Sequence, residues 1–343
     1  MTEPLVVATP QGLYCAAGDF YIDPMEPVAR AVITHAHGDH ARSGSQSYLA
    51  TQISLPILRH RLGAGTSLAG LAYGETVQLG RARVSLHPAG HVLGSAQVRI
   101  ETTGDEREVW VVSGDYKRGA DPTCAPFEVV PCDVFVTEAT FAAPIYRWDP
   151  GEVVASEMLA WWRACAAQET TALMFCYAFG KAQRLLAELA RLAASGEELP
   201  RTPILLHGAM VELVALYREA GVEMPPTVHL SEEVPRASYP GQLVLAPPSA
   251  YRSPWMRRFR KFETAFASGW MRVRGAQRQR GHDRGFVLSD HADWPDLTRT
   301  CLETGARRIY VMHGRADLLV RWLRERGHDA SELSTAFARG SED

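Results

Sequence analysis

With 343 residues, of which 46% are apolar and 22% charged, the chain has the composition of a soluble globular protein with one large domain or two ordinary ones. No run of 18 apolar residues occurs, so a helical membrane span is not expected, and residues 1–12 lack the basic start and apolar core of a secretory signal. The six cysteines form no Cys-x-x-Cys pair, which argues against a zinc knuckle or disulfide framework and favours a reduced cytoplasm.

The net charge of −3 is distributed unevenly along the chain. From Tyr251 to Arg284 there are ten Lys or Arg residues against two acidic ones, a local balance of +8 that leaves −11 for the rest. A basic segment on an acidic body suggests a polyanionic partner. An arginine-rich codon usage would give the same count, so the asymmetry alone does not identify one.

The first 140 residues are expected to form short strands separated by Gly and Pro turns. The run Val109–Val112 is continuously apolar, which is typical of a strand buried on both faces. Strands are predicted at Leu13–Cys15, Phe20–Asp23, Ala31–Thr34, Val84–Pro88, Ala96–Glu101, Val109–Ser113 and Val134–Thr137, and a helix at Gln52–Arg61.

Beyond Pro150 the pattern changes to alternating helices and strands, which favours a parallel α/β layer. The expected plan is a core domain interrupted by an α/β insertion and completed by the C-terminal segment. Helices are predicted at Glu152–Gln168, Lys181–Ser195, Met210–Ala220, Trp294–Glu303 and Ala316–Arg326, and strands at Thr171–Cys176, Pro203–His207, Gln242–Ala246, Gly285–Ser289 and Arg308–Met312.

The basic segment begins with a further predicted helix. Ser253 and Pro254 resemble an N-cap followed by a first-turn proline. Four aromatic residues then follow at helical spacing, and a buried helix face is the preferred interpretation over a base-stacking platform. These residues are Trp255, Phe259, Phe262 and Phe266.

The most informative segment is His35–His40, which reads HAHGDH and follows the apolar strand Ala31–Thr34. Residues i and i+2 of an extended chain point the same way, so His35 and His37 can hold one metal ion together. Asp39 and His40 follow where the chain must turn, and they can face a second ion. Imidazole and carboxylate are ligands that Zn²⁺ and similar ions prefer.

Further residues of the metal-binding type follow the ends of other predicted strands. Loops on a rigid sheet commonly build a site in this way. These residues are His91, Asp115, Glu138, His291 and His313.

Together these motifs resemble the metallo-β-lactamase superfamily, and specifically its β-CASP nucleic-acid-processing branch. Asp23 matches the first motif as a residue that orients the metal ligands, and Glu138, His291 and His313 match motifs A, B and C. The opening residues 12–24 and the length look most like the bacterial ligase-associated DNA exonucleases, which are related to the Artemis-type nucleases. The resemblance implies an αββα sandwich of residues 1–141 and 286–343, with a β-CASP cap at 142–285.

The resemblance also implies a reaction. His35, His37 and His91 would bind one ion, Asp39, His40 and His313 the other, and Asp115 both. Two such ions activate water for attack on phosphorus, with Zn²⁺ expected and Mn²⁺ or Fe²⁺ possible. His291 is the expected general acid, held in its tautomer by Glu138, and Asp39 is counted with the catalytic residues. Expected nucleic-acid contacts are Lys181, Arg257, Arg258, Lys261, Arg278 and Arg280.

The function expected from this resemblance is a DNA exonuclease in repair, acting on single-stranded or end-containing DNA, with an ATP-dependent ligase and a helicase as functional partners. An RNA-processing nuclease is the first alternative, because His at motif C is common in RNA-processing members whereas Artemis-type enzymes usually have Val. A small-molecule thioesterase or lactonase and an inactive binding subunit are the others. No membrane association is expected.

Overall fold

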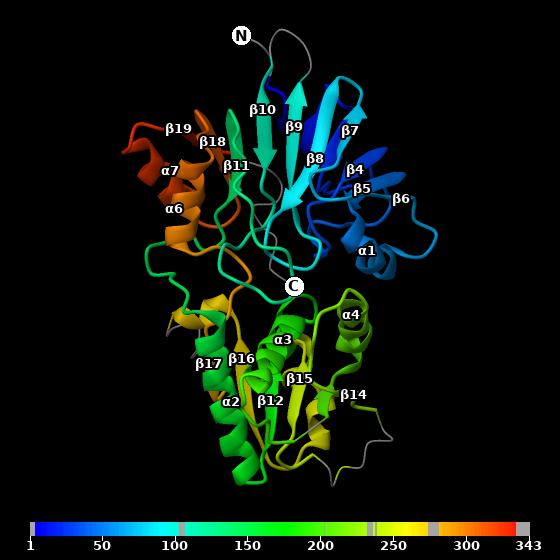
Figure 1. The fold of residues 1–343 in the computed structure, drawn as a ribbon, viewed down its shortest axis with the longest axis vertical. Coiled ribbons are helices and arrows are strands. Elements are labelled where there is room, and N and C mark those ends of the chain that lie inside the picture. Colours follow the sequence, from blue (N-terminus) through cyan, green and yellow to red (C-terminus); the bar gives the residue numbers. More distant parts are fainter. Residues whose placement is uncertain are drawn as a thin grey trace. The chain divides into compact units, whose positions relative to one another are not determined.

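The computed structural model describes residues 4–102, 107–201, 203–231, 236, 239–273 and 281–333, and the chain forms two compact units (Figure 1). Unit 1 consists of Met1–Gly119, Cys124–Arg147 and His291–Asp343. Unit 2 consists of Ala120–Thr123 and Trp148–Asp290. Both units combine strands with helices, so the α/β class expected from the sequence is confirmed.

Unit 1 contains two sheets. The first has the order β1-β2-β3-β4-β5-β6, with parallel pairing from β3 onward. Its strands are β1 (Val7–Thr9), β2 (Gly12–Cys15), β3 (Phe20–Ile22), β4 (Arg30–Val32), β5 (Ser47–Thr51) and β6 (Leu68–Leu71). After β5 come the short η1 (Gln52–Ser54) and the helix α1 (Leu55–Leu62).

The second sheet of unit 1 has the order β19-β18-β11-β10-β9-β8-β7. Pairing is antiparallel from β7 to β10 and parallel from β10 to β19. The strands are β7 (Thr76–Leu79), β8 (Ala82–Pro88), β9 (Ala96–Thr102), β10 (Val109–Val112), β11 (Val134–Glu138), β18 (Arg308–Met312) and β19 (Asp329–Glu332). The helices α6 (Trp294–Glu303) and α7 (Ala316–Arg324) flank β18 in sequence.

The core of unit 1 lies on both faces of the second sheet. One apolar cluster joins Phe20 of the first sheet to Val98 of the second, so the two sheets pack face to face. Another joins the second sheet to Leu297 of α6 and Leu319 of α7. Trp110 and Val112 of β10 belong to the first cluster and Val111 to the second, which confirms that β10 is buried on both faces.

Unit 2 is built on one parallel sheet in the order β14-β13-β15-β12-β16-β17. The helices α2, α3 and α4 contribute to the apolar cluster on one face, and segments between residues 239 and 271 contribute to the cluster on the other. The elements are α2 (Gly151–Ala167), β12 (Thr171–Phe175), α3 (Lys181–Ala194), β13 (Ile204–Leu206), α4 (Gly208–Glu219), β14 (Thr227–His229), β15 (Leu243–Ala246), η3 (Pro248–Ala250), η4 (Pro254–Arg258), β16 (Phe262–Ala267), η5 (Gly269–Arg272) and β17 (Arg284–Phe286).

The helix predicted from Ser253 through Phe266 is wrong. Ser253 does cap a helical turn, since its side chain accepts a hydrogen bond from the Trp255 amide, but this turn is the short η4. The residues after Lys261 form strand β16, which pairs with both β12 and β17. Strand pairing on two sides satisfies the backbone and buries residues 264–267, and this tertiary gain overrides the helical spacing of the aromatic residues.

Besides Ala120–Thr123, unit 2 consists of one continuous stretch, Trp148–Asp290; the insertion expected from the sequence is 142–285. Residues 142–147 stay with unit 1 because Tyr146 packs on Phe141 and its carbonyl accepts the Trp294 amide at 3.2 Å. None of the helices described is long and apolar enough to cross a membrane.

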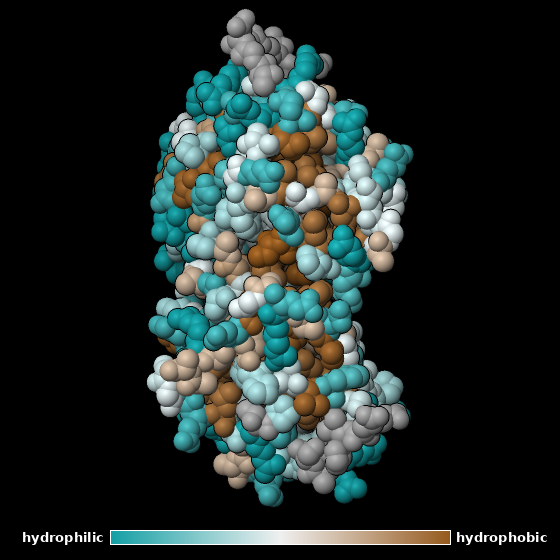
Figure 2. Space-filling view, turned by 45° about the vertical axis from the view of Figure 1, so that its right-hand side comes forward, coloured by the Kyte–Doolittle hydropathy of each residue, from teal (hydrophilic) through white to brown (hydrophobic). Residues whose placement is uncertain are grey.

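The surface drawn in Figure 2 mixes polar and apolar side chains. Among the described residues, the large apolar side chains with the greatest exposure belong to several different elements of the two units. They are Ile53, Ile145, Val153, Val228, Phe262 and Leu302.

Candidate metal centre

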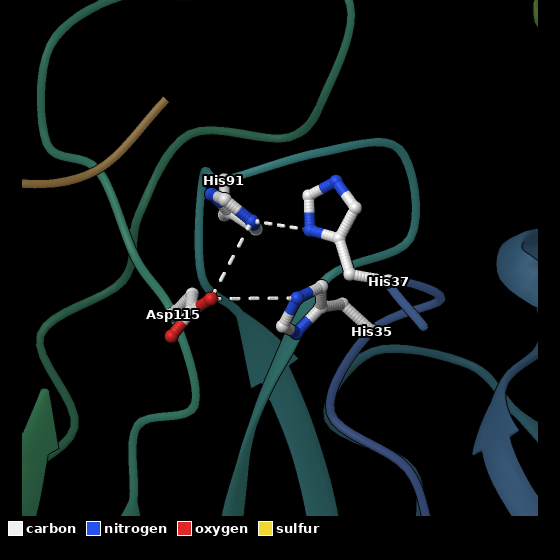
Figure 3. A group of neighbouring side chains, drawn as sticks. All are labelled: His35, His37, His91 and Asp115. Atoms are coloured by element: carbon white, nitrogen blue, oxygen red, sulfur yellow. Dashed lines mark hydrogen bonds and ion pairs between the residues drawn. The ribbon is translucent and has the colours of Figure 1, made fainter. Parts of the chain in front are cut away.

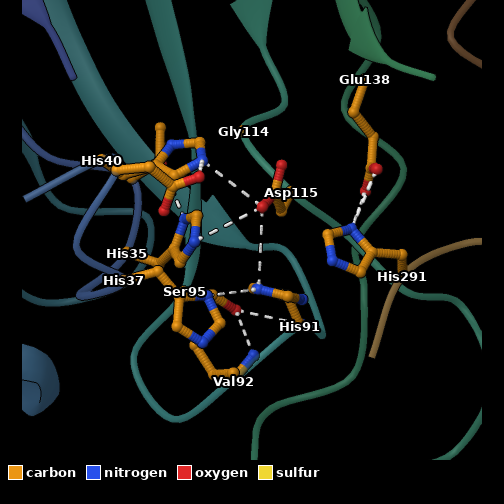
Figure 4. A network of polar contacts seen from close by, with 12 residues as sticks. His35, His37, His40, His91, Val92, Ser95, Gly114, Asp115, Glu138 and His291 are labelled. Atoms are coloured by element: carbon orange, nitrogen blue, oxygen red, sulfur yellow. Dashed lines mark hydrogen bonds and ion pairs between the residues drawn. The ribbon is translucent and has the colours of Figure 1, made fainter. Parts of the chain in front are cut away.

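The loop after β4 places several imidazoles in the interior of unit 1. His35 and His40 are each at most 2% exposed. The loop turns tightly, because the His40 and Ala41 amides both donate to the His37 carbonyl, at 3.2 and 2.8 Å. This turn lets three imidazoles of a six-residue segment gather in one place (Figure 4).

The first group of potential ligands consists of His35, His37, His91 and Asp115 (Figure 3). One ligand atom from each lies within 4.8 Å of the others. His91 Nε2 is 3.1 Å from His37 Nδ1, and Asp115 Oδ2 is 3.5 Å from His35 Nε2 and 3.9 Å from His91 Nε2. Three imidazole nitrogens and one carboxylate oxygen therefore converge on one small volume.

A second group shares the same aspartate and consists of His40, Asp115 and His313. His40 Nε2 is 3.4 Å from Asp115 Oδ2. Asp39 does not join this group: its carboxylate is 33% exposed and lies 3.7 Å from His40 Nε2. The structure thus gathers six of the seven expected ligands into two groups that meet at Asp115, and it leaves Asp39 at the edge.

His313 directly follows β18 and has a left-handed backbone, with φ of 64°. Gly314 is also left-handed, and a side chain on it would collide with the Ala139 carbonyl at the end of the neighbouring strand β11. Such backbone conformations are costly for non-glycine residues and are found mainly at functional sites.

Glu138 and His291 form a buried pair beside Asp115 (Figure 4). His291 Nδ1 is 3.0 Å from Glu138 Oε2, and Glu138 Oε1 accepts the Tyr116 amide at 2.8 Å. A carboxylate in this position favours the tautomer with the proton on Nδ1, so that Nε2 of His291 is left to act on another group.

Asp23 holds the loop His35–His40 in place through hydrogen bonds. Its carboxylate accepts hydrogen bonds from the Thr34 amide at 2.8 Å and from the Thr34 hydroxyl at 2.5 Å. Asp23 Oδ2 is also 2.8 Å from His40 Nδ1, which directs His40 Nε2 toward Asp115. Ligand histidines are commonly oriented by a carboxylate in this manner. The contribution of Thr34 was not foreseen from the sequence; its only signal is its place between the strand and the motif.

The loops that carry Asp115 and His91 lie close to the other histidines because of a glycine in the first and a serine in the second. Gly114 has φ of 56°, and a side chain there would lie 2.6 Å from Thr34 Cβ, so a glycine brings Asp115 next to the histidine loop. The Ser95 hydroxyl accepts the amides of His91 and Val92 at 3.1 and 3.2 Å, which fixes the turn that carries His91 (Figure 4).

Burial and charge set the protonation of the centre. Burial lowers the pKa of His35 far below its usual value, that of His37 to about 3, and that of His313 to a smaller degree. Burial would also lower the pKa of His40, but the carboxylates of Asp115 and Asp23 raise it well above 6.5. Burial opposes ionisation of Asp115 as well, yet the neighbouring histidines, His40 first, keep its pKa well below 3.8.

This donor set fits divalent metal ions. Metal ligation requires neutral imidazoles and ionised carboxylates, and these are the forms that the pKa shifts of His35, His37, His313 and Asp115 favour. His40 is the exception: its raised pKa favours the charged ring, which would have to release a proton to bind a metal. In addition, Nε2 of His35 is buried and makes no hydrogen bond to any part of the chain that the structure describes. A buried nitrogen of this kind needs a partner, which a metal ion would supply.

The expected nucleic-acid contacts have varied surroundings. Lys181 is 4% exposed and its ammonium lies 3.1 Å from Asp290 Oδ2, so it is not placed as a surface phosphate contact. Lys261 donates to the Gln168 carbonyl and Arg258 to the Leu230 carbonyl. Arg257 is exposed at the rim of a hollow of about 560 Å³. Arg278 and Arg280 lie outside the described residues.

Unit 2 holds a buried charge cluster that was missed from the sequence. Arg184 Nε lies 3.1 Å from Asp121, and its Nη1 lies 3.2 Å from Asp290 and also donates to the Ser289 carbonyl. These partners are 63 and more than 100 residues away in the chain. Only the tertiary fold brings them together, so no local pattern could have revealed the cluster.

Together, the fold and the site describe a mixed α/β protein with a buried, His- and Asp-rich centre suited to divalent cations. No family model matches the chain. Over 332 residues, or 95% of its length, the chain is 31% identical to a protein of Opitutus terrae named Probable DNA ligase. It spans only 31% of that relative's length.

A solved structure of similar fold is that of a protein of unknown function from Enterococcus faecalis V583, with a TM-score of 0.57. The match covers 82% of this chain and 74% of the other, at 11% sequence identity. At this identity the likeness concerns the fold alone.

Proposed function

We propose that the protein is a dinuclear-metal phosphodiesterase of the metallo-β-lactamase superfamily, β-CASP branch, and that it acts as a DNA exonuclease in repair. The observation that carries this proposal is the position of Asp115, which belongs to both ligand groups and lies beside the pair Glu138–His291. A carboxylate shared by two groups suits a pair of metal ions. A simple hydrolase of small esters has no need for the additional acid.

The fold supports the same assignment. Two face-to-face sheets, with α6 and α7 packed on the second, agree with a metallo-β-lactamase sandwich. Most of unit 2 lies in the sequence between Arg147 and His291, and therefore between β11 and β18, the strand that precedes His313. A β-CASP cap would be inserted at this point.

In this proposal His35, His37 and His91 would hold one ion, His40 and His313 would hold the other, and Asp115 would serve both. Asp39, whose partly exposed carboxylate lies 3.7 Å from His40 Nε2, would complete the second site. Two divalent ions bound there would lower the pKa of water and stabilise charge on the phosphate oxygens. Zn²⁺ is the expected metal, and Mn²⁺ or Fe²⁺ would accept the same ligands.

The residues of the chain perform the proton transfers. Glu138 accepts a hydrogen bond from His291 Nδ1–H, which holds the ring in one orientation. Protonated at Nε2, His291 then donates to the leaving oxygen as the phosphodiester bond breaks. Asp23 keeps His40 oriented through its Nδ1 hydrogen bond, so that Nε2 remains available to a metal.

DNA is favoured as the substrate because the relative named Probable DNA ligase aligns with nearly the whole chain. That name belongs to a protein about three times as long as the aligned segment. An end-trimming nuclease would prepare ends for joining, so functional association with an ATP-dependent ligase, and with a helicase, is part of the proposal. The six cysteines are all free, as expected in the cytoplasm.

RNA is the second candidate substrate, and His313 is the observation that favours it, since it occupies the motif C position. Purified protein should be tested on end-labelled single-stranded DNA and matched RNA with Zn²⁺, Mn²⁺ or Fe²⁺ added. We expect stepwise shortening of DNA, and its loss in His291→Ala but not in the surface control His60→Ala. Preferential cleavage of RNA would replace the DNA assignment, and no cleavage of either with bound metal would reject the nuclease.

A further inference from the structure

Helix α1 is anchored on the loop that carries His91. The Thr51 hydroxyl, just before η1, donates to the Gly94 carbonyl at 2.6 Å. A side chain at Gly94 would come within 2.8 Å of the Ser54 backbone, so the start of α1 lies tightly against this loop. Both contacts are within unit 1, and they fix the helix relative to the first ligand group.

The other end of α1 reaches the HAHGDH loop. The guanidinium of Arg61 lies against Gly38, where any side chain would collide with its Nη2. Gly38 stands between His37 and Asp39, so this cation lies beside the backbone that carries ligands of the centre. Glycine at position 38 leaves room for this close approach.

The side chain of Arg61 forms no ion pair and no hydrogen bond with the residues that the structure describes. Its side chain is exposed overall, although the protein around the guanidinium lowers its pKa, an effect that Asp39 partly opposes. Arg118, by contrast, forms an ion pair with Glu303. A guanidinium beside the ligand loop, with no ion pair to the described residues, is placed to receive an anion from outside.

We propose that Arg61 binds a backbone phosphate of the nucleic-acid substrate, next to the bond that is cleaved. The inference rests on the proposed function and adds a substrate-positioning residue to it. Guanidinium matches phosphate oxygens in a bidentate geometry, which a lysine does not reproduce. A contact of this kind gives affinity and register without base preference. We therefore expect Arg61 to affect all sequences alike.

Arg61→Ala tests the proposal. We expect KM for single-stranded DNA to rise about 10- to 100-fold, as for loss of a charge-assisted hydrogen-bonded pair, while kcat changes less than about threefold. The slope of log Kd against log salt concentration should become shallower by about 0.7, because the variant neutralises one phosphate fewer. Arg61→Lys should keep the salt slope and recover only part of the affinity.

The matched control is Arg59→Ala, which removes an exposed arginine two residues earlier on the same helix. Its KM should stay within about twofold of the wild-type value, and its salt slope should differ from that of the wild type by less than about 0.2. Metal content of Arg61→Ala should equal that of the wild type. Loss of metal in that variant would make Arg61 a support for Asp39 instead and would overturn the proposal.

Binding is measured in the His291→Ala background, so that it does not depend on cleavage. If the wild type binds single-stranded DNA but cleaves neither DNA nor RNA, the nuclease assignment fails, and the salt slope still decides the role of Arg61. If the wild type cleaves DNA and Arg61→Ala leaves KM and salt slope unchanged, the nuclease stands and the proposal for Arg61 fails.

Discussion

Asp115 joins the two ligand groups, and its replacement should therefore disturb both. Asp115→Asn keeps the volume but removes the charge that balances two cations. We expect metal bound per chain to fall from about two ions to one or fewer, and activity to fall by more than about 10³-fold, because two-metal chemistry needs both ions. Elemental analysis of dialysed protein measures this, with Asp317→Asn, an exposed carboxylate, as the control. If Asp115→Asn still bound two ions, Asp115 would not be a ligand shared by the two metal sites.

His291 should affect chemistry without affecting the metals. His291 lies beside Asp115, but its Nδ1 is hydrogen-bonded to Glu138. We therefore expect His291→Asn to bind as much metal as the wild type. Loss of general acid catalysis commonly costs about 10² to 10⁴ in rate, and we expect kcat to fall by that amount. Glu138→Gln should have a smaller effect and shift the pH profile of kcat, because the ring then loses its negative partner. If His291→Asn bound no metal, His291 would instead be a metal ligand.

The metal-free protein should lose stability in mild acid. Burial, the main cause, holds the pKa of His35, His37 and His313 below 6.5, so below that pH the unfolded chain binds protons that the folded chain does not. Their contribution is complete above pH 6.5 and is lost as pH falls toward the folded pKa values, by up to about 1.4 kcal/mol per pH unit for each histidine.

His40 has the opposite sign, since its pKa is raised: its stabilising contribution is fully present well below pH 6.5 and is lost only as pH rises above that value, so it adds no loss in acid. Urea unfolding of chelated protein between pH 6.5 and 5 should therefore show a falling free energy of unfolding. The slope should be smaller in His37→Asn. A flat profile would contradict neutral histidines in the folded state.

At this scale the sequence is a good guide. The HAHGDH spacing and the strand-end residues predicted which side chains converge, because most of them lie at or just after the end of a strand with buried residues. The sequence does not reveal the surroundings of Lys181 and Arg61, because distant segments supply them: Lys181 contacts Asp290, and Arg61 lies against Gly38.

At the scale of elements, helix α3 carries the buried arginine of unit 2. Arg184 neutralises Asp121 and Asp290, which are at most 5% exposed in their side chains. Arg184→Met would remove this cation from buried Asp121 and leave Asp290 with its ion pair to Lys181, and loss of one partner of a buried pair costs about 3–5 kcal/mol. We expect that loss in the free energy of unfolding measured by denaturant.

The control for Arg184 is Arg163→Met, which removes an exposed ion pair with Glu197 and should cost less than about 1 kcal/mol. An equal, small effect of the two variants would mean that water or rearrangement compensates for Arg184. Binding of metal should persist in both, since the ligands belong to unit 1.

Elements with long apolar runs were predictable and marginal strands were not. β10, β11, α2 and α6 were found within one or two residues of their expected bounds. β19, with the sequence Asp-Ala-Ser-Glu, has no strand pattern of its own and forms because β18 offers a free edge. β16 was missed because its aromatic residues also fit a helix, and only pairing with β12 and β17 decides between the two.

At the scale of the molecule, unit 1 is assembled from three stretches of chain. β11 and β18 are parallel neighbours, with Val134 opposite Arg308, although more than 170 residues separate them. Apolar runs predicted both strands, but nothing in either run specifies the partner or the register. The order of the ligand motifs was the stronger clue, because all of them must meet in one site.

This assembly has a consequence for biosynthesis. A chain growing from its N-terminus already contains His35, His37, His91 and Asp115 when residue 115 has been made, whereas His291 and His313 are made only after the whole of unit 2. Until β18 emerges and pairs with β11, the second ligand group lacks His313 and the proposed general acid has no fixed position. The proposed nuclease would thus be inactive as a nascent chain on the ribosome, and its activity would appear only with the completed fold.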